Sequence, residues 1–159
     1  RLLHHELRLQ WRLEYKAFNY YKTSNAIAEG NYLYTARDGT CAYSSKAHTA
    51  ALTTGYTNVA ASNVTAMKSA LAIKPLLFHQ ADTNVFQSYS SGIFNSSLCG
   101  TNLDHAVMVV GWGTSGTTEY WLLRNSWGKT WGESGYMRVQ INAGNGICGV
   151  QMEPLYPNV

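Results

Sequence analysis

The sequence is poor in charge and has no long apolar run. Charged residues make up 13% of its 159 residues, against 45% apolar residues. Intrinsic disorder is therefore not expected, because it requires low hydrophobicity together with high net charge. No apolar stretch approaches the ~18 residues of a membrane-spanning helix, and the first residues lack the uninterrupted apolar stretch of a signal peptide. We therefore expect a globular chain without a membrane span.

Positive charge and cysteine are also scarce. The net charge is only +3, and five of the twelve basic residues lie within the first 22 positions. This balance does not support a nucleic-acid interface. The three cysteines are an odd number, so at least one of them lacks an internal disulfide partner. Cys99, His105 and Cys148 lack the paired short spacings of a zinc site, and we expect no metal.

Hydrophobic spacing divides the chain into a helical front third and a β-rich remainder. Residues 13–24 have a helical apolar spacing, and a second helix is expected over about 62–73, capped by Ser62 or Asn63 and ended by Pro75. Beyond Pro75 the clearest strand-like runs are 106–110, 119–123 and 136–141. Strands with short connections and no helices between them predict an antiparallel sheet or barrel.

A glycine pattern within this β-rich part resembles a cofactor motif. Residues 111–116 (GWGTSG) match the glycine spacing of dinucleotide-binding proteins. That motif needs a helix beginning at the glycines, whose amides hold the pyrophosphate. The residues that follow here are typical of a strand, so we interpret the glycines as a hairpin turn and expect no cofactor.

A histidine and an asparagine lie at the ends of two of the expected strands. A hairpin joining these strands would bring Asn125 beside His105. An asparagine side chain can accept the imidazole N–H, which fixes the tautomer and leaves the other nitrogen facing a nucleophile. Trp127 could cover this hydrogen bond from water. On the residues alone, a structural histidine and a tryptophan-rich turn that serves only packing remain alternatives.

The residues around this pair resemble a known family. LDHAVMVVGWG (103–113) and YWLLRNSWGKTWGESGYMRV (120–139) resemble the second half of papain-like cysteine peptidases, the group containing the cathepsins. The resemblance covers about residues 13–159 and includes EGNYLYTARDGTC, VFQSYSSGIFNSSLC and GICGVQMEPLYP. It implies an α+β fold, with a remnant of a left helical domain over 13–56 and a right-hand antiparallel β-barrel domain with a C-terminal tail over 57–159.

The resemblance also implies roles for individual residues. His105 would be the general base and acid, Asn125 its orienting partner and Trp127 the shield over both. Leu103 and Asp104 would line the cleft beside His105. Cys99 and Cys148 match a disulfide of the right domain, a pairing we favour over a zinc site. The implied reaction is hydrolysis of peptide or protein substrates by a cysteine thiolate through an acyl-enzyme.

The family's main specificity pocket involves Glu153 by this resemblance. Glu153 lies five residues after Cys148, where the family places the floor of that pocket. An acidic group there resembles cathepsin B, which accepts arginine as well as hydrophobic side chains, and a carboxylate can hold a guanidinium by a forked contact. A surface glutamate remains the alternative. His48 and His79 are interpreted as surface residues.

The nucleophilic cysteine is not found in this sequence. In the family it precedes the histidine by about 130–150 residues, which places it before Arg1. Cys41 instead matches a structural cysteine of the left domain. We therefore expect the chain alone to be inactive and to pair with a missing N-terminal left domain. The alternative is a non-catalytic homologue that binds peptides or proteins.

Residues 1–12 do not fit the family, which has an Asp-Cys segment ending in Gly-Cys-Asn-Gly-Gly at this place. Codons for RLLHHELRLQWR can be chosen so that the bases, read one position later, encode DCYTTNSGCNGG. We therefore interpret residues 1–12 as an aberrant, frame-shifted segment, with a divergent amphipathic leader as the alternative. By resemblance the protein is lysosomal, vacuolar or secreted, and glycosylation sequons at Asn63 and Asn95 fit an oxidising route.

Overall fold

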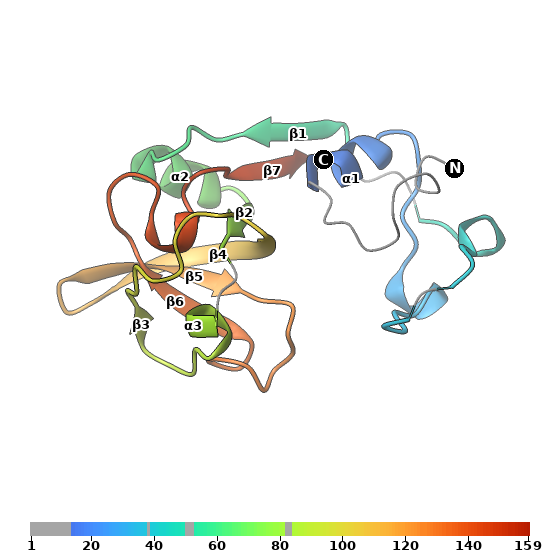
Figure 1. Cartoon of the computed structure of the whole chain (residues 1–159). Coiled ribbons are helices and arrows are strands. Elements are labelled where there is room, and N and C mark those ends of the chain that lie inside the picture. Colours follow the sequence, from blue (N-terminus) through green and yellow to red (C-terminus); the bar gives the residue numbers. More distant parts are fainter. Residues whose placement is uncertain (1–13, 38, 50–52, 82–83) are drawn as a thin grey trace. The chain divides into compact units, whose positions relative to one another are not determined.

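The structure, a computed structural model, describes residues 14–37, 39–49, 53–81 and 84–159. The chain forms two compact units, Arg1–Tyr56 with Pro157–Val159, and Thr57–Tyr156 (Figure 1). The last three residues, which the sequence analysis placed in a C-terminal tail of the right domain, group with the first unit, where the Thr54 amide donates to the Asn158 carbonyl at 2.8 Å. The frame-shift interpretation of residues 1–12 lies outside the described residues.

The described part of the first unit contains little regular structure. Its helix α1 (Glu14–Tyr20) ends earlier than the expected 13–24, and two short 3-10 turns follow, η1 (Glu29–Asn31) and η2 (Tyr43–Ser45). Tyr43 ties this unit together, because its hydroxyl donates to the Asn25 carbonyl at 2.7 Å and its ring stacks on His48 at 4.3 Å. His48 is exposed, as expected, and Cys41 is an exposed free thiol.

The second unit begins with the helix that its sequence predicts. Helix α2 (Val64–Leu71) starts after Asn63, whose side chain accepts a hydrogen bond from the Ala66 amide at 3.0 Å. This N-cap satisfies one of the amides that a first helical turn leaves without a partner. Met67 and Leu71 form the buried face, and Pro75 follows the helix.

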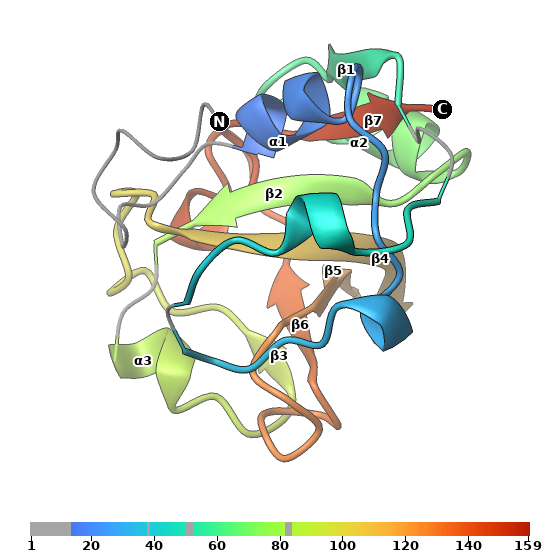
Figure 2. The same ribbon diagram turned by 90° about the vertical axis from the view of Figure 1, so that its right-hand side faces the viewer.

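A seven-stranded sheet dominates the described residues, in the order β1-β7-β2-β4-β5-β6-β3. Its strand pairs are antiparallel where β2 meets β4 and β7 and where β5 meets β4 and β6, whereas β3 and β6 are parallel. The strands are β1 (Gly55–Asn58), β2 (Leu76–Gln80), β3 (Ile93–Phe94), β4 (His105–Ser115), β5 (Thr118–Arg124), β6 (Tyr136–Gln140) and β7 (Leu155–Asn158). Figure 2 shows β2 between β7 and β4. The fold is α+β, as predicted.

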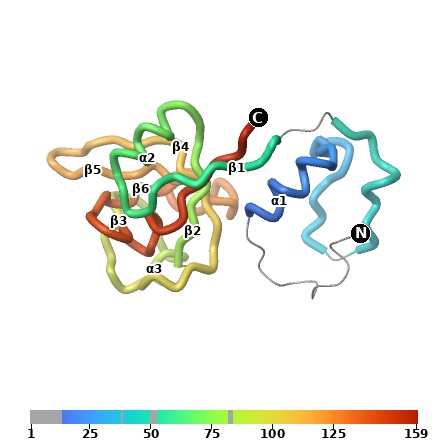
Figure 3. Tube along the Cα trace, turned by 90° about the horizontal axis from the view of Figure 1, so that it is seen from above, coloured from blue at the N-terminus to red at the C-terminus, as the bar shows by residue number. Residues whose placement is uncertain are grey.

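The long β4–β5 hairpin carries the glycine pattern that resembled a cofactor motif. It projects from the sheet in Figure 1 and Figure 3. Strand β4 runs to Ser115 and β5 starts at Thr118, so no helix follows the glycines and the hairpin interpretation is confirmed. A side chain at Gly113 would meet the Tyr120 hydroxyl at 2.7 Å, so close cross-strand packing explains this glycine.

The core of the second unit is built on alternate residues of the sheet. Trp121 is fully buried, and its ring meets Phe78 edge-on at 6.0 Å. The indole N–H donates to the Gln151 side-chain oxygen at 3.1 Å, and the Gln151 amide nitrogen donates to the carbonyls of Asn142 (2.8 Å) and Gly144 (2.7 Å). Buried polar groups need such partners, and Gln151 therefore anchors the 142–151 loop to the core.

Two further elements border the site described next. They are α3 (Asn84–Gln87) and the 3-10 turn η3 (Ile147–Gly149), which follows β6. The disulfide predicted between Cys99 and Cys148 is present, with a Cα–Cα distance of 5.2 Å, and it ties η3 to the segment before β4. In the described part of the chain no helix has both the length and the apolar character needed to cross a membrane.

Candidate active site

His105 and Asn125 meet at the edge of the β4–β5 hairpin. His105 is the first residue of β4 and Asn125 directly follows β5, so the antiparallel pairing brings the two residues together. The His105 Nε2 atom lies 2.9 Å from the Asn125 Oδ1 atom. Both residues are buried, with 6% and 9% of their surface exposed. This contact holds Nε2 as the protonated nitrogen and leaves Nδ1 as the basic one.

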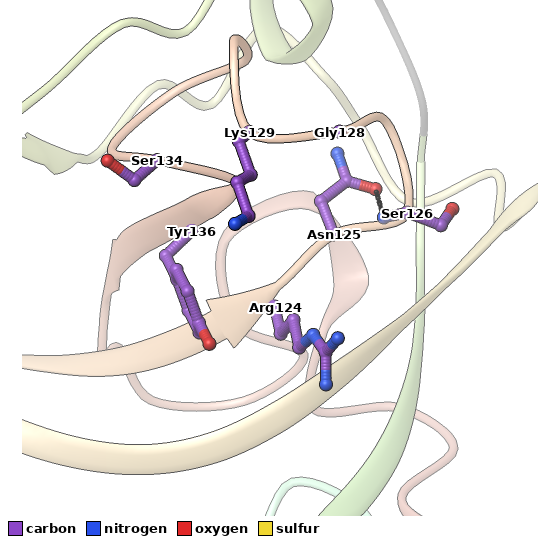
Figure 4. A pocket seen from close by; sticks show the side chains of 8 residues that line it. Arg124, Asn125, Ser126, Gly128, Lys129, Ser134 and Tyr136 are labelled. Atoms are coloured by element: carbon purple, nitrogen blue, oxygen red, sulfur yellow. Dashed lines mark hydrogen bonds between the residues drawn. The ribbon is translucent and has the colours of Figure 1, made fainter.

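The orientation of the Asn125 side chain is itself constrained. Its Oδ1 atom also accepts a hydrogen bond from the Ser126 amide at 2.7 Å (Figure 4), which directs the oxygen toward the imidazole. The Asn125 amide donates to the Gly135 carbonyl at 3.0 Å, so the backbone beyond β5 is held against the start of β6. The acceptor that His105 requires is therefore set by hydrogen bonds rather than by packing alone.

Trp127 covers the imidazole. Its ring stacks on that of His105 with centroids 4.9 Å apart and an interplanar angle of 23°. Phe86 of α3 meets Trp127 edge-on at 5.7 Å and lies 6.4 Å from His105. These aromatic rings exclude water from one side of the His105–Asn125 contact, where lower polarity strengthens a hydrogen bond.

An ion pair missed by the sequence analysis anchors the loop that carries Trp127. The Arg138 guanidinium donates to Glu133 through Nε at 2.9 Å and through a terminal nitrogen at 2.6 Å. The Gly92 amide donates to the same carboxylate at 2.9 Å. The pKa of Glu133 is lowered, first by the hydrogen bonds from Arg138, while partial burial opposes this, and the pKa of Arg138 is raised by the same pairing.

The rest of this loop is fixed by Trp131 and Tyr89. The Trp131 indole N–H donates to the Gln87 carbonyl at 2.9 Å, and its ring stacks on Phe86 at 5.4 Å. The Tyr89 hydroxyl donates to the Gly92 carbonyl at 2.7 Å, and burial raises the pKa of this phenol. In the sequence, only the many tryptophans of residues 121–131 indicated this aromatic cluster. The residues that contact Trp131, Phe86 and Gln87, lie more than 40 positions earlier and could not be paired with it by spacing.

Two other residues expected at the site lie at the start of β4. Leu103 and Asp104 directly precede His105, and the Asp104 amide donates to the Gln80 carbonyl at 3.0 Å. Asp104 is exposed, whereas Leu103 is half-buried and close to Gly149, where an added Cβ would meet its side chain at 2.7 Å.

Glu153 faces a histidine that the sequence analysis misplaced. The His79 Nδ1 atom lies 3.3 Å from a carboxylate oxygen of Glu153, whose side chain is 55% exposed. The expectation that His79 is a surface residue is wrong, since only 8% of its surface is exposed. The reason is that β2 pairs on both sides, with β7 and with β4, which places His79 inside the sheet rather than at an edge. Among the described residues, no group of three potential metal-ligating side chains occurs.

Comparison with known proteins identifies the family to which this arrangement belongs. The family model described as "Papain family cysteine protease" matches residues 10–158. The chain belongs to this family. Cysteine endopeptidase Rep1 of Oryza sativa subsp. japonica is 44% identical over 147 residues, which are 89% of this chain and 39% of that protein. Fruit bromelain of Ananas comosus is 38% identical over 148 residues, which are 91% of this chain and 42% of that protein.

Solved structures of the papain family share the fold. The bromelain protease from Ananas comosus in complex with the E64 inhibitor superimposes with a TM-score of 0.86 at 35% identity, covering 94% of this chain and 70% of that one. Digestive procathepsin L 3 of Tenebrio molitor larval midgut gives 0.83 at 32% identity, covering 93% of this chain and 49% of that one. The chain thus spans about two fifths of the length of the two curated papain-family relatives above.

Proposed function

We propose that this papain-family chain carries the base half of a cysteine peptidase active site, with His105 as general base and acid and Asn125 as its orienting partner. The observation that supports this role is the 2.9 Å contact between His105 Nε2 and Asn125 Oδ1 beneath the Trp127 ring. A histidine needs a fixed tautomer to exchange one proton with a nucleophile and a leaving group, and the Asn125 oxygen supplies that constraint.

In the proposed reaction His105 acts twice. Its Nδ1 atom takes the proton of a cysteine thiol, and the thiolate attacks the peptide carbonyl carbon. The protonated imidazole then gives this proton to the leaving amine as the C–N bond breaks, which leaves an acyl-enzyme. A water molecule, deprotonated by the same nitrogen, hydrolyses the thioester and returns the thiol. Asn125 stabilises the imidazolium that forms in each half of the reaction.

We infer that the thiol is supplied by polypeptide outside this sequence and that the chain alone is inactive. Cys99 and Cys148 are joined in a disulfide, so neither has a thiol. Cys41 is free and exposed, but its sequence context matches a structural cysteine rather than a nucleophile that opens a helix. The proposed partner is a left domain of the papain type, which brings the thiolate to the base half and completes the cleft.

The proposed substrates are peptides or proteins that bind beside His105. Leu103, Asp104 and Glu153 are the residues proposed to contact them, with Glu153 able to hold an arginine side chain by a forked contact. His79 competes for the same carboxylate at 3.3 Å, so arginine binding requires the substrate to replace this contact. The disulfide, together with papain-type relatives, supports a lysosomal, vacuolar or extracellular location for the protein.

A chimera tests the catalytic proposal. The part of fruit bromelain that this chain does not match would be joined to the chain, and hydrolysis of a fluorogenic peptide would be measured with and without E-64. We expect thiol-dependent hydrolysis that E-64 blocks and that His105→Ala abolishes, while the unjoined chain has none. The matched control is His48→Ala, which changes an exposed histidine of the first unit and should leave activity intact. A folded chimera without activity would contradict the proposal.

A second candidate function is peptide binding without catalysis. It is favoured by a largely apolar groove of about 300 Å³ beside Asn125. The groove is lined by Leu77, Ala106, Val107, Met108, Arg124, Asn125 and Ser126. Saturable binding of peptides by the unjoined chain, weakened by Met108→Asp, combined with an inactive chimera would favour this function.

A further inference from the structure

The sequon at Asn95 is a modification motif that the proposed reaction does not use. Residues 95–97 read Asn-Ser-Ser, which fits the acceptor pattern for N-linked glycosylation: an asparagine, any residue except proline, then serine or threonine. Asn95 directly follows β3 and is exposed, and Ser97, which carries the hydroxyl of the pattern, is exposed as well. Both groups of the acceptor therefore lie at the surface of the folded chain.

The Asn95 side chain takes no part in holding its segment together. Within the described part of the chain it makes no hydrogen bond and no ion pair. The turn that follows is held by other atoms, because the Ser96 hydroxyl oxygen accepts from the Leu98 amide at 3.2 Å and the Ser97 carbonyl accepts from the Gly100 amide at 3.4 Å. A substituent on the Asn95 amide nitrogen would thus break no contact of the folded state.

The second sequon differs in this respect. The Asn63 side chain is the N-cap of α2, and its oxygen accepts from the Ala66 amide at 3.0 Å. Thr65, which carries the hydroxyl of this sequon, lies within the first turn of the helix. The Asn63 amide therefore has a structural role that its sequence position already explains, whereas the Asn95 amide has none.

The contacts that fix the Asn95 segment are made with residues much later in the sequence. Phe94 pairs with Val139 in the parallel β3–β6 ladder, and Cys99 is joined to Cys148, 49 positions away. In a chain synthesised at roughly 5–20 residues per second, the segment lacks these partners for about 2–10 s. The Asn95 sequon is therefore open to a modifying enzyme during this interval, before the fold closes around it.

The place of Asn95 in the sheet has room for a glycan in the folded protein. Strand β3 is the last in the sheet order, whereas β1 and β7, which contain residues of the first unit, lie at the other end of that order (Figure 1). An outer strand has backbone groups that can pair with another chain, and the nearby Leu98 side chain is 80% exposed. A bulky, hydrophilic glycan on Asn95 would cover this end of the sheet and oppose such association.

We propose that Asn95 is a site of N-linked glycosylation. The Asn95 amide nitrogen loses a proton and forms a bond to the anomeric carbon of an oligosaccharide, while the bond from this carbon to a lipid pyrophosphate breaks and the pyrophosphate leaves. The donor is thus a lipid-linked oligosaccharide. The proposal rests on the lysosomal, vacuolar or extracellular location proposed for the protein, because these destinations are reached through the secretory pathway. It does not depend on the catalytic role of His105.

Translation of the full chain with endoplasmic reticulum microsomes tests the proposal. The chain would carry an added secretory signal and a flexible C-terminal tag with one Asn-Gly-Thr acceptor, and only chains glycosylated on the tag would be analysed. Every molecule counted has then entered the lumen, so an error in the proposed location does not affect the result.

The readout is specific to one asparagine. Peptide N-glycosidase F in heavy-oxygen water converts a glycosylated asparagine to a labelled aspartate, which mass spectrometry assigns to its position. We expect the label at Asn95 in wild type and its complete loss in Asn95→Gln. Because the label is assigned to a position, occupancy of Asn63 does not enter the result. An unlabelled Asn95 in chains with a glycosylated tag would overturn the proposal.

Two adjacent serines provide the matched comparison. Ser97→Ala removes the hydroxyl of the sequon and should abolish the label at Asn95. Ser96→Ala removes a hydroxyl from the middle position and should retain the label, as should Ser97→Thr, which keeps a hydroxyl at the required place. Acceptor recognition precedes folding, so these results do not depend on whether a variant folds. The same outcome in Ser96→Ala and Ser97→Ala would contradict enzymatic glycosylation of Asn95.

Discussion

The Trp127 ring lies over His105 on the same imidazole whose Nε2 atom contacts Asn125 Oδ1. The ring thus covers a histidine 22 positions earlier in the sequence. It shields the hydrogen bond between His105 and Asn125 from water on the side of the loop that carries Trp127. This loop is anchored by Glu133 and Arg138 and not by Trp127 alone. The covering of His105 by Trp127 and the orientation of His105 by Asn125 can therefore be tested separately.

Replacing Asn125 should disturb both stability and the His105 tautomer. In Asn125→Ala the His105 Nε2–H and the Ser126 amide lose their acceptor, and a buried donor without a partner costs about 1–3 kcal/mol. We expect the free energy of unfolding in urea to fall by this amount and the imidazole nitrogen resonances to show a mixture of tautomers. Asn102→Ala, at an exposed position, is the control. An unchanged tautomer in Asn125→Ala would show that another group orients His105.

Removing the Trp127 ring should expose the imidazole. We expect Trp127→Ala to lower stability by about 2–4 kcal/mol, somewhat less than for a fully buried aromatic side chain, and to speed exchange of the His105 N–H with solvent. Trp127→Phe should retain most of both properties. Trp112→Ala serves for comparison, because Trp112 is 41% exposed and its loss should cost less. Equal exchange rates in wild type and Trp127→Ala would contradict the shielding role.

The Glu133–Arg138 pair should make stability depend on acid pH. The pKa of Glu133 is lowered in the folded state from its usual 4.5, so its stabilising effect is fully present above that pH. This stabilisation is lost as pH falls through the folded pKa, because the protonated carboxyl no longer pairs with Arg138. Urea denaturation of wild type and Glu133→Gln should therefore differ at pH 7, and the difference should shrink as pH falls below 4.5 and through the folded pKa.

Glu119→Gln provides a comparison for this pH series. Glu119 pairs with Lys68 at 2.5 Å, but its side chain is 48% exposed, so solvent screens the pair and little stability should be lost. A difference between wild type and Glu133→Gln that stays constant down to pH 2 would exclude titration of Glu133 as its source.

The disulfide should contribute strongly to the stability of the second unit. Cys99 and Cys148 are 49 positions apart, and a crosslink that closes a loop of this length stabilises by about 4 kcal/mol in the chain-entropy model. The paired variant Cys99→Ser with Cys148→Ser should lose roughly that free energy in thermal or urea unfolding. Cys41→Ser, which changes the exposed free cysteine, should have no such effect. Equal stability of the paired variant and wild type would contradict this expectation.

His79 and Glu153 should affect substrate preference in opposite directions if the completed enzyme is active. Glu153→Ala should reduce kcat/KM for arginine-containing peptides by about tenfold or more through loss of a charge-assisted contact, while hydrophobic substrates are unaffected. His79→Ala should increase the preference for arginine, since the carboxylate loses its competing partner at 3.3 Å. Unchanged preference in both variants would place Glu153 outside the specificity pocket.

Local signals in the sequence were sufficient for several elements. Asn63 begins α2 because its side chain can accept an amide of the first turn, and this interaction involves residues only three positions apart. The β4–β5 hairpin follows from alternating apolar residues around the glycine-rich run ending at Gly116. Once these two strands pair, residues at their ends must be neighbours, which is why the meeting of His105 and Asn125 could be expected.

Positions that depend on distant segments could not be assigned in this way. His79 looked like a surface residue because its own segment does not reveal that β2 has a strand on each side. Gln151 is fully buried, and its side-chain oxygen accepts the indole N–H of Trp121, 30 positions earlier. The residues next to His79 and Gln151 in the sequence do not indicate that these two side chains are buried.

The spacing of residues along short segments determined the two strands at whose ends His105 and Asn125 lie, and the motifs of the sequence implied, by resemblance, the family, the α+β class and the Cys99–Cys148 disulfide. Only the tertiary structure decided that Glu133 and Arg138 hold the Trp127 loop and that His79 faces Glu153. Charged side chains at the surface and in the core look alike in a sequence, and their environment is set by which distant strands and loops pack against them.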